Sequence, residues 1–147
     1  MSKSTINLST QELAEQNRLV VERFFHTMET QDFEVIKEIF APEGKQLMPY
    51  APKGYQSSVN GLDAVYKQFS ELPSRFAYFR YPRRLYTTDD PNLIFAKFTG
   101  EIGLHDGSVY ANDYVGTFKM ENGKILEYAE YFNPFIMAKA FDIDLSA

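Results

Sequence analysis

A carboxylate stands among aromatic residues near the end of the chain. In KILEYAEYFNPF, residues 124–135, strict alternation would put Leu126, Tyr128, Glu130 and Phe132 on one face of a strand. A carboxyl group held out of water among aromatic rings has a pKa raised toward neutrality, so it can give and take a proton. On a solvent-facing surface the same residue would do no chemistry. Glu130 is therefore the candidate catalytic residue, and its spacing alone leaves both interpretations open.

Further polar side chains are expected beside this glutamate. Tyr110, Asn112 and Tyr114 alternate onto one face of residues 109–120, the neighbouring strand of a predicted antiparallel pair. They are candidates to orient the Glu130 carboxylate, to bind a ligand, or to polarise its carbonyl group. The alternative is that the tyrosines are structural, with hydroxyl groups satisfied inside the protein.

Metal and thiol chemistry have few candidate residues. The chain has no cysteine, and its only histidines are His26 and His105, which excludes a three-histidine zinc site. His105 falls in a predicted hairpin loop, where solvent exposure is expected. His26 is expected at the boundary of a long helix, and would contact substrate as a second proton carrier only if it faced a pocket. No metal ion or organic cofactor is predicted.

Composition narrows the class of protein. The 147 residues suit one domain, with 44% hydrophobic and 24% charged residues. No apolar run is long enough to cross a membrane, and no signal start is visible, so a cytoplasmic protein is predicted. The absence of cysteine also fits that reducing compartment.

Nucleic acid is not an expected partner. The net charge is −5, which provides no basic footprint for phosphates. Arginines do interleave with aromatics in RFAYFRYPRRLY, residues 75–86, but alternation along a strand produces the same pattern. Arg80, Arg83 or Arg84 remain candidates to meet a carboxylate group on a small ligand.

The aromatic content is high, at 13 Phe and 10 Tyr, or 16% of the chain. Tyrosine brings a hydroxyl group that needs a hydrogen-bond partner when it is buried. These residues could lie at the core boundary and a dimer interface. They could also line a pocket for a flat cyclic or aromatic ligand.

Three helices precede a series of strands. The helices are predicted from the capping box at Ser9 and Glu12 to about residue 30, from the N-cap Asp32 to Pro42 and Gly44, and from the N-cap Asn60 to Pro73. The strands are predicted at about 76–88, 92–103, 109–120 and 124–133, joined by the turns DDPN, HDGS and ENGK.

This order predicts an α+β fold in one domain spanning residues 1–147, with residues 1–8 as a flexible tail and 136–147 as a C-terminal extension. The helices cannot cover both faces of the sheet. A curved antiparallel sheet is therefore expected to wrap around the N-terminal helices as a cone, a cystatin-like roll with one open pocket.

Several motifs carry a resemblance to a known superfamily. They are QNRLVVERFF at 16–25, NGLDAVYKQF at 60–69, TDDPN at 88–92, and Tyr110, Asn112, Phe118, the GKI at 123–125, Glu130, Asn133 and Phe135. Together they resemble the nuclear-transport-factor-2-like, or SnoaL-like, superfamily, and within it the phenazine-biosynthesis proteins PhzA and PhzB. The resemblance covers nearly the whole chain.

The resemblance implies a cone-shaped pocket and a homodimer packed sheet against sheet. It also implies cofactor-free acid/base assistance to a condensation of cyclic aminoketones, with the family's pocket glutamate at Glu130. The family's histidine falls on Gln68 and its serine on Leu72, so these residues and Tyr128 are expected to contact substrate. Glutamine cannot carry a proton near neutral pH as histidine can.

Two functions therefore remain open. One is an isomerase, cyclase or condensing enzyme of secondary metabolism that acts on a cyclic carbonyl compound. The other is a non-catalytic metabolite-binding or accessory protein built on the same scaffold.

Overall fold

The computed structural model describes residues 8–146, so the tail expected over residues 1–8 lies, except for Leu8, outside the described residues. The α-helices are α1 (Thr10–Thr30), α2 (Ile36–Ile39), α3 (Leu62–Ser70) and α4 (Pro134–Phe141), and the short 3-10 helices are η1 (Phe33–Val35) and η2 (Leu72–Ser74). The strands are β1 (Phe40–Leu47), β2 (Ser58–Asn60), β3 (Phe76–Arg80), β4 (Arg83–Thr87), β5 (Leu93–Leu104), β6 (Val109–Glu121) and β7 (Lys124–Phe132). No helix among these residues is long and apolar enough to span a bilayer.

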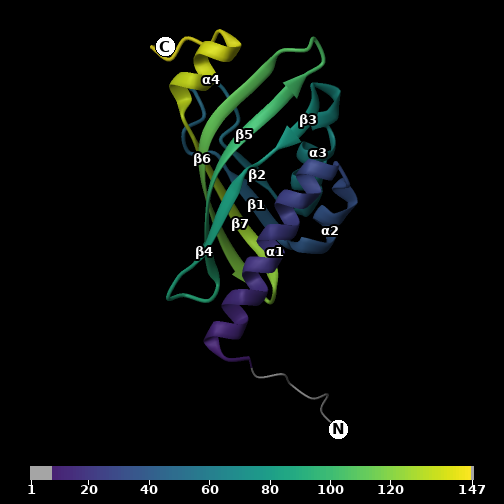
Figure 1. Ribbon diagram of the computed structural model, residues 1–147, viewed down its shortest axis with the longest axis vertical. Coiled ribbons are helices and arrows are strands. Elements are labelled where there is room, and N and C mark those ends of the chain that lie inside the picture. The colour runs from purple at the N-terminus through teal and green to yellow at the C-terminus, as the bar shows by residue number, and fades with distance from the viewer. Residues whose placement is uncertain (1–7, 147) are drawn as a thin grey trace.

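One curved sheet holds all seven strands in the order β2-β1-β7-β6-β5-β3, with β4 also paired to β5. The predicted meander is confirmed, because β5, β6 and β7 are consecutive antiparallel neighbours. The pairing of β1 with β7 is parallel, so the sheet as a whole is mixed. Helices α1, α2 and α3 lie against one side of the sheet, and α4 lies at its opposite end from the start of α1 (Figure 1). The predicted α+β cone is confirmed.

Helix α1 forms as the sequence predicts. Ser9 caps it, since its hydroxyl accepts the Glu12 N–H at 3.1 Å while the Glu12 carboxylate accepts the Ser9 N–H at 3.1 Å. Its inward face carries Phe24, Phe25 and Met28, each no more than 3% exposed. Burying each such side chain contributes about 1.5–3 kcal/mol. This helix therefore anchors the sheet's concave side.

The second and third helices begin and end differently from the prediction. The second ends at Ile39, because Phe40 already pairs with Ile125 as part of β1. Asn60 does not cap the third helix, because it belongs to β2 and pairs with Lys45 of β1. Gly61 takes the N-cap position with a φ of 92°. A positive φ at that position suits glycine. Strand pairing thus overrides the local helix signals at both places.

The alternation along β7 is interrupted by a bulge. Glu127 pairs with Lys119, but the next pair toward the turn is Ile125 with Met120, so Leu126 is an extra residue. Fully buried Ile125 therefore joins Tyr128 on the inner face, and the expectation that Leu126 shares the face of Glu130 is wrong. The register after the bulge sets the direction of Glu130.

The single strand expected over residues 76–88 is two strands. β3 pairs with one half of β5 and β4 with the other half, and Tyr81 and Pro82 lie between them. Proline has no N–H to donate to a sheet ladder, which accounts for the break.

Candidate functional site

A cavity of about 330 Å³ opens toward the end of the sheet where α4 lies. Its walls come from α1, β1, the 48–57 loop, α3 and η2, β3, the inner faces of β5 to β7, and α4. The greater part of the lining is apolar, including Met28, Phe69, Phe76, Phe79, Ile102 and Phe132. Polar groups within it are few, which is the usual composition of a small-molecule site.

Glu130 lines this cavity from β7. The Tyr128 hydroxyl donates a hydrogen bond to Glu130 Oε2 at 3.0 Å, and no cation pairs with this carboxylate among the described residues. Burial raises the pKa of Glu130 from 4.5 to about 7, while the Tyr128 bond opposes that rise by favouring the charged form. The carboxyl group can thus change its protonation state near neutral pH.

Tyr81 and Tyr114 line the cavity around the same carboxyl group. Burial, followed by the charge of Glu130, raises the pKa of each hydroxyl far above its usual range, so both stay protonated. The Tyr81 hydroxyl has no hydrogen-bond partner among the described residues. The Tyr114 hydroxyl shares a hydrogen bond with Tyr110. Tyr81 is therefore placed to donate a hydrogen bond to a ligand atom near Glu130, and Tyr114 would do so by giving up its bond to Tyr110.

A glycine on β5 makes room for these two rings. A Cβ atom at Gly100 would lie 2.7 Å from Tyr114 Cε2 and 3.3 Å from Tyr81 Cε1. The Tyr114 ring also stacks on Phe98, with 4.9 Å between centroids. The close approach of the two tyrosines thus depends on the missing side chain at Gly100.

Asn112 is buried, but it does not line the cavity. Its amide nitrogen donates to the Tyr110 hydroxyl at 2.5 Å and to the Asn133 carbonyl at 3.0 Å, and its oxygen accepts the Asn133 N–H at 3.2 Å. The expected hydrogen bond from Asn112 to Glu130 is therefore not formed among the described residues. Asn112 instead extends the β6–β7 pairing to Asn133.

That pairing also holds the C-terminal helix. The Asn133 side chain caps α4 by accepting the Phe135 N–H at 3.0 Å. Tyr110, which lines the cavity, packs on Phe141 of α4 with 4.9 Å between ring centroids. Phe141 and Met137 also line the cavity, so the C-terminal extension closes part of its mouth.

Gln68 and Leu72 both line the cavity, as expected for residues in contact with substrate. The Gln68 amide nitrogen donates to Gln46 Oε1 at 3.0 Å. Gln46, on β1, is 3% exposed and also lines the cavity, although the sequence did not single it out. Tyr128 is 1% exposed, donates a hydrogen bond to Glu130 and is not part of the lining.

His26 does not face the cavity, because it is exposed on α1. The condition for His26 to act as a second proton carrier is therefore not met. Arg80 pairs with Glu101, and Arg83 pairs with Glu22 and Glu29. Neither arginine lines the cavity, and Arg84 does not line it either.

Arg75 is the arginine that lines the cavity. It is exposed, its guanidinium lies 5.4 Å from the Phe76 ring centroid, and it makes no ion pair with a described carboxylate. Arg75 begins the segment RFAYFRYPRRLY, whose pattern does not distinguish it from the other arginines there. Alternation from Phe79 is the signal that could have pointed to Tyr81.

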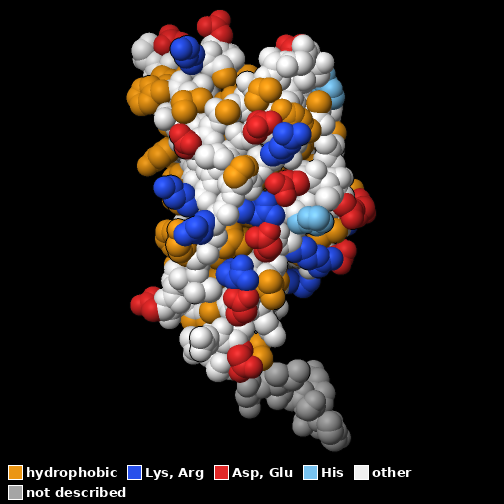
Figure 2. All heavy atoms as spheres, viewed as in Figure 1, with side chains coloured by type: hydrophobic (Ala, Val, Ile, Leu, Met, Phe, Trp, Pro, Cys, Tyr) orange, Lys and Arg blue, Asp and Glu red, His pale blue; other side chains and the backbone are white. Residues whose placement is uncertain are grey.

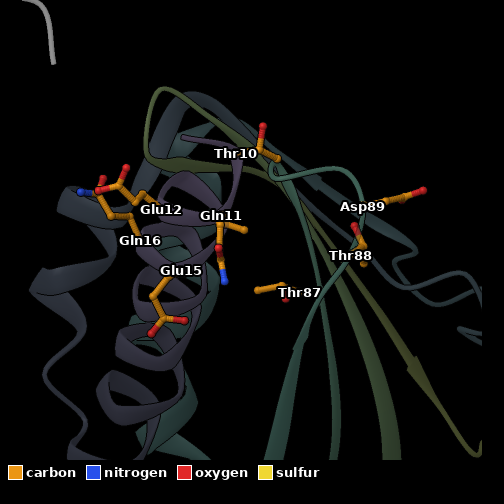
Figure 3. Close-up of a pocket in the computed structure, with 9 residues that line it drawn as sticks. Thr10, Gln11, Glu12, Glu15, Gln16, Thr87, Thr88 and Asp89 are labelled. Carbon is orange, nitrogen blue, oxygen red and sulfur yellow. The ribbon is translucent and has the colours of Figure 1, made fainter. Parts of the chain in front are cut away.

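A second hollow lies between the first turns of α1 and the segment that follows β4 (Figure 3). Glu12 and Glu15 line it, but Glu12 is part of the helix cap and Glu15 pairs with Arg18 at 2.6 Å. Figure 2 shows charged side chains of both signs over α1, and hydrophobic ones gathered toward the end where α4 lies. The cavity around Glu130 is thus the better candidate site.

Comparison with known proteins identifies the family to which this fold belongs. A family model described as "SnoaL-like domain" matches residues 21–128. The chain belongs to the SnoaL-like domain family. The match ends two residues before Glu130, so it covers the scaffold of this SnoaL-like domain but not its candidate acid.

Relatives of this SnoaL-like domain carry phenazine-related names. An uncharacterised PhzA/B-like protein of Pseudomonas aeruginosa is 29% identical over 98 residues, 66% of this chain and 70% of the relative. The phenazine biosynthesis protein PhzB1 of the same organism is 28% identical over 138 residues, 90% of this chain and 84% of PhzB1. The crystal structure of its phenazine biosynthesis-related protein PhzB2 matches with a TM-score of 0.79 at 21% identity, over 97% of this chain and 91% of that one. This last likeness supports the fold.

The raised pKa of Glu130 predicts a pH-dependent stability. Between pH 4.5 and about 7 the folded protein holds a proton that the unfolded chain releases, so this contribution is lost as pH rises through 7. Glu130→Gln is neutral at every pH. Between pH 5 and pH 8 the parent should therefore lose about 2 kcal/mol of unfolding free energy that the Glu130→Gln variant keeps. Urea denaturation of both proteins at each pH measures this difference. Parallel pH profiles for the two proteins would contradict a raised pKa.

Proposed function

We propose that this protein is a cofactor-independent acid/base enzyme of secondary metabolism, an isomerase, cyclase or condensing enzyme for a cyclic carbonyl compound. One observation carries the proposal: a carboxyl group with a pKa of about 7 shares an apolar cavity with two protonated tyrosine hydroxyls. Proton carriers work best when their pKa lies near the working pH. The names of the phenazine-related relatives support the metabolic context.

The chemistry needs only residues of this chain. A substrate carbonyl oxygen would accept hydrogen bonds from the Tyr81 and Tyr114 hydroxyls, which would stabilise the negative charge that develops there. The Glu130 carboxylate would remove a proton from the carbon next to that carbonyl, leaving an enolate. The protonated Glu130 would then return the proton to a different atom, which completes an isomerisation or prepares a condensation.

The size and lining of the cavity also limit which ligands would fit. A volume of about 330 Å³ lined by aromatic and thioether groups suits a flat ring system with few polar atoms. Arg75, the cation of the described lining, would pair with an acidic group of the ligand, and Gln68 would bind a polar edge. Substrate would thus lie with its carbonyl toward Glu130 and its acid toward Arg75.

Gln68 favours a second candidate function. It lines the cavity at the position where the resemblance places a histidine, and an amide cannot relay a proton. A protein with one acid and no second carrier could bind a metabolite without converting it. Turnover is therefore the measurement that separates the two functions.

Proton exchange tests the enzyme proposal. We would incubate the protein in D₂O with a panel of flat cyclic ketones, with and without a ring carboxylate, and follow exchange next to the carbonyl by NMR. The parent should accelerate exchange, Glu130→Gln should lower that rate by about 10²–10⁴-fold, and Tyr114→Phe by about 10-fold or more. Binding without exchange in the parent would support the non-catalytic alternative. Full exchange by Glu130→Gln would remove the proposed mechanism.

Arg75 gives a prediction about binding. Phenazine-1-carboxylic acid should raise the melting temperature of the parent more than the matching carboxamide does, because only the acid can pair with the guanidinium. Arg75→Gln should abolish that difference, while Arg80→Gln, outside the cavity, should preserve it. Equal shifts with acid and carboxamide in the parent would argue against Arg75 as the anion-binding residue.

We also propose that two copies associate through the outer face of the sheet. Tyr86 pairs with Phe95, and Val115 pairs with Tyr131 in the neighbouring row of the outer face. The two pairs form a diagonal apolar stripe across β4 to β7, with Thr117 and Lys97 beside it. Tyr86, Phe95 and Val115 are 47%, 39% and 39% exposed. Such a stripe on a curved sheet suits a second copy of itself.

Light scattering after size-exclusion chromatography tests this assembly. The parent should elute at twice the 17.0 kDa chain mass, and Val115→Arg should elute as a monomer, because a charge cannot be buried unpaired. Leu19→Arg is the control, since Leu19 is 52% exposed on α1 and lies outside the stripe. A monomeric parent would exclude the proposed dimer.

A further inference from the structure

We propose that Glu29 and Arg83 act as a clamp that aims the Tyr81 hydroxyl at the substrate carbonyl. Neither residue lines the cavity, so both would be positioning residues that act through Tyr81. The inference rests on the proposed function, in which Tyr81 donates a hydrogen bond next to Glu130.

The backbone of Tyr81 needs partners outside the sheet. β3 ends with the Arg80–Glu101 pair and β4 begins with the Arg83–Phe98 pair, so Tyr81 belongs to neither ladder. Tyr81 is only 8% exposed, and a buried N–H or C=O group without a partner is costly. The break that frees Tyr81 from the sheet therefore creates the need for other hydrogen bonds.

Glu29 and Arg83 supply these hydrogen bonds. The Tyr81 N–H donates to Glu29 Oε2 at 2.9 Å, and Arg83 Nη1 donates to the Tyr81 carbonyl at 3.0 Å. The same Nη1 donates to Glu29 Oε1 at 2.9 Å, which joins the two halves. Both backbone polar groups of one residue are thus held by one ion pair.

The clamp is itself fixed in place. The Arg83 side chain is 15% exposed, and its guanidinium also pairs with Glu22 and lies 5.3 Å from the Phe25 ring centroid. Charged hydrogen bonds in such a partly buried place are strong and directional. Since Glu22, Phe25 and Glu29 all belong to α1, the helix determines where the Tyr81 backbone lies.

The position of the backbone then determines the position of the ring. The Tyr81 ring lies beside Gly100, with its Cε1 atom 3.3 Å from where a Cβ of residue 100 would be. The charge of Glu130 contributes to the raised pKa of the Tyr81 hydroxyl. A hydrogen-bond donor must lie within a few tenths of an ångström of its place to stabilise a developing charge. Loosening the clamp should therefore move the hydroxyl without unfolding the domain.

Fluorine NMR with 3-fluorotyrosine at position 81 tests the clamp without a ligand. In the parent, the signal should differ from that of the urea-unfolded chain and should titrate near pH 7 with Glu130. In Glu29→Ala, both the shift difference and the titration amplitude should fall by at least half. Glu29→Gln, which keeps an acceptor for the Tyr81 N–H, should restore most of both.

Glu22→Ala is the matched control. It removes the same charge and one partner of Arg83, but Glu22 has no hydrogen bond to the Tyr81 backbone. It should keep the parent signal, as should a label at Tyr114 in every variant that remains folded by circular dichroism. Should Glu29→Ala fail to fold, Arg83→Lys, which cannot bridge both acceptors as the guanidinium does, takes its place with the same expected loss.

The results separate the clamp from the proposed function. An unchanged Tyr81 signal in Glu29→Ala, or an equal loss in Glu22→Ala, would overturn the clamp whatever Glu130 does. A parent signal that does not titrate near pH 7 would weaken the role of Glu130 instead, while the shift difference would still report on the clamp.

Discussion

The site depends on one partly buried carboxyl group that pairs with no cation among the described residues. Glu130 has a single tyrosine hydroxyl as its hydrogen-bond donor among the described residues, so burial dominates and the proton stays on until about pH 7. An arginine or lysine in contact would have kept the group charged and useless as an acid. The free cation of the described lining, Arg75, is exposed and so does not neutralise it.

The surrounding architecture serves this arrangement by leaving space and by supplying neutral donors. A Cβ atom at Gly100 or Gly116 would lie only 2.7 or 2.9 Å from a tyrosine ring atom, so glycine is needed at both positions. Those rings belong to Tyr114 and Tyr128, which contact or face the carboxyl group. Their hydroxyls remain protonated because the same apolar surroundings that protonate Glu130 also disfavour a phenolate. One physical cause thus sets the state of both acid and donors.

The polar residues that are not in the cavity hold the irregular parts of its wall. Where backbone pairing stops at the end of β7, the Asn112 side chain hydrogen-bonds to the backbone of Asn133. The Asn133 side chain in turn caps the start of α4. The Glu29–Arg83 pair does the same for the gap between β3 and β4. Both places are where regular pairing stops and a cavity residue must still be held. Buried backbone groups need partners, so side chains supply them there.

The sequence by itself determined the long first helix, the meander of the last strands and the candidate acid. The capping box at Ser9, the Asn-Gly turn at 122–123 and the aromatic setting of Glu130 are local patterns, and local chemistry was enough to interpret them. Whether Asn112, Tyr81, Arg75 and His26 line the cavity was decided only by the tertiary structure. A bulge, a proline break and a parallel pairing with β1 settle which way these side chains point, and each depends on contacts between segments far apart in the chain. Alternation cannot show where it is interrupted, because the interruption lowers the free energy only when the whole sheet has formed.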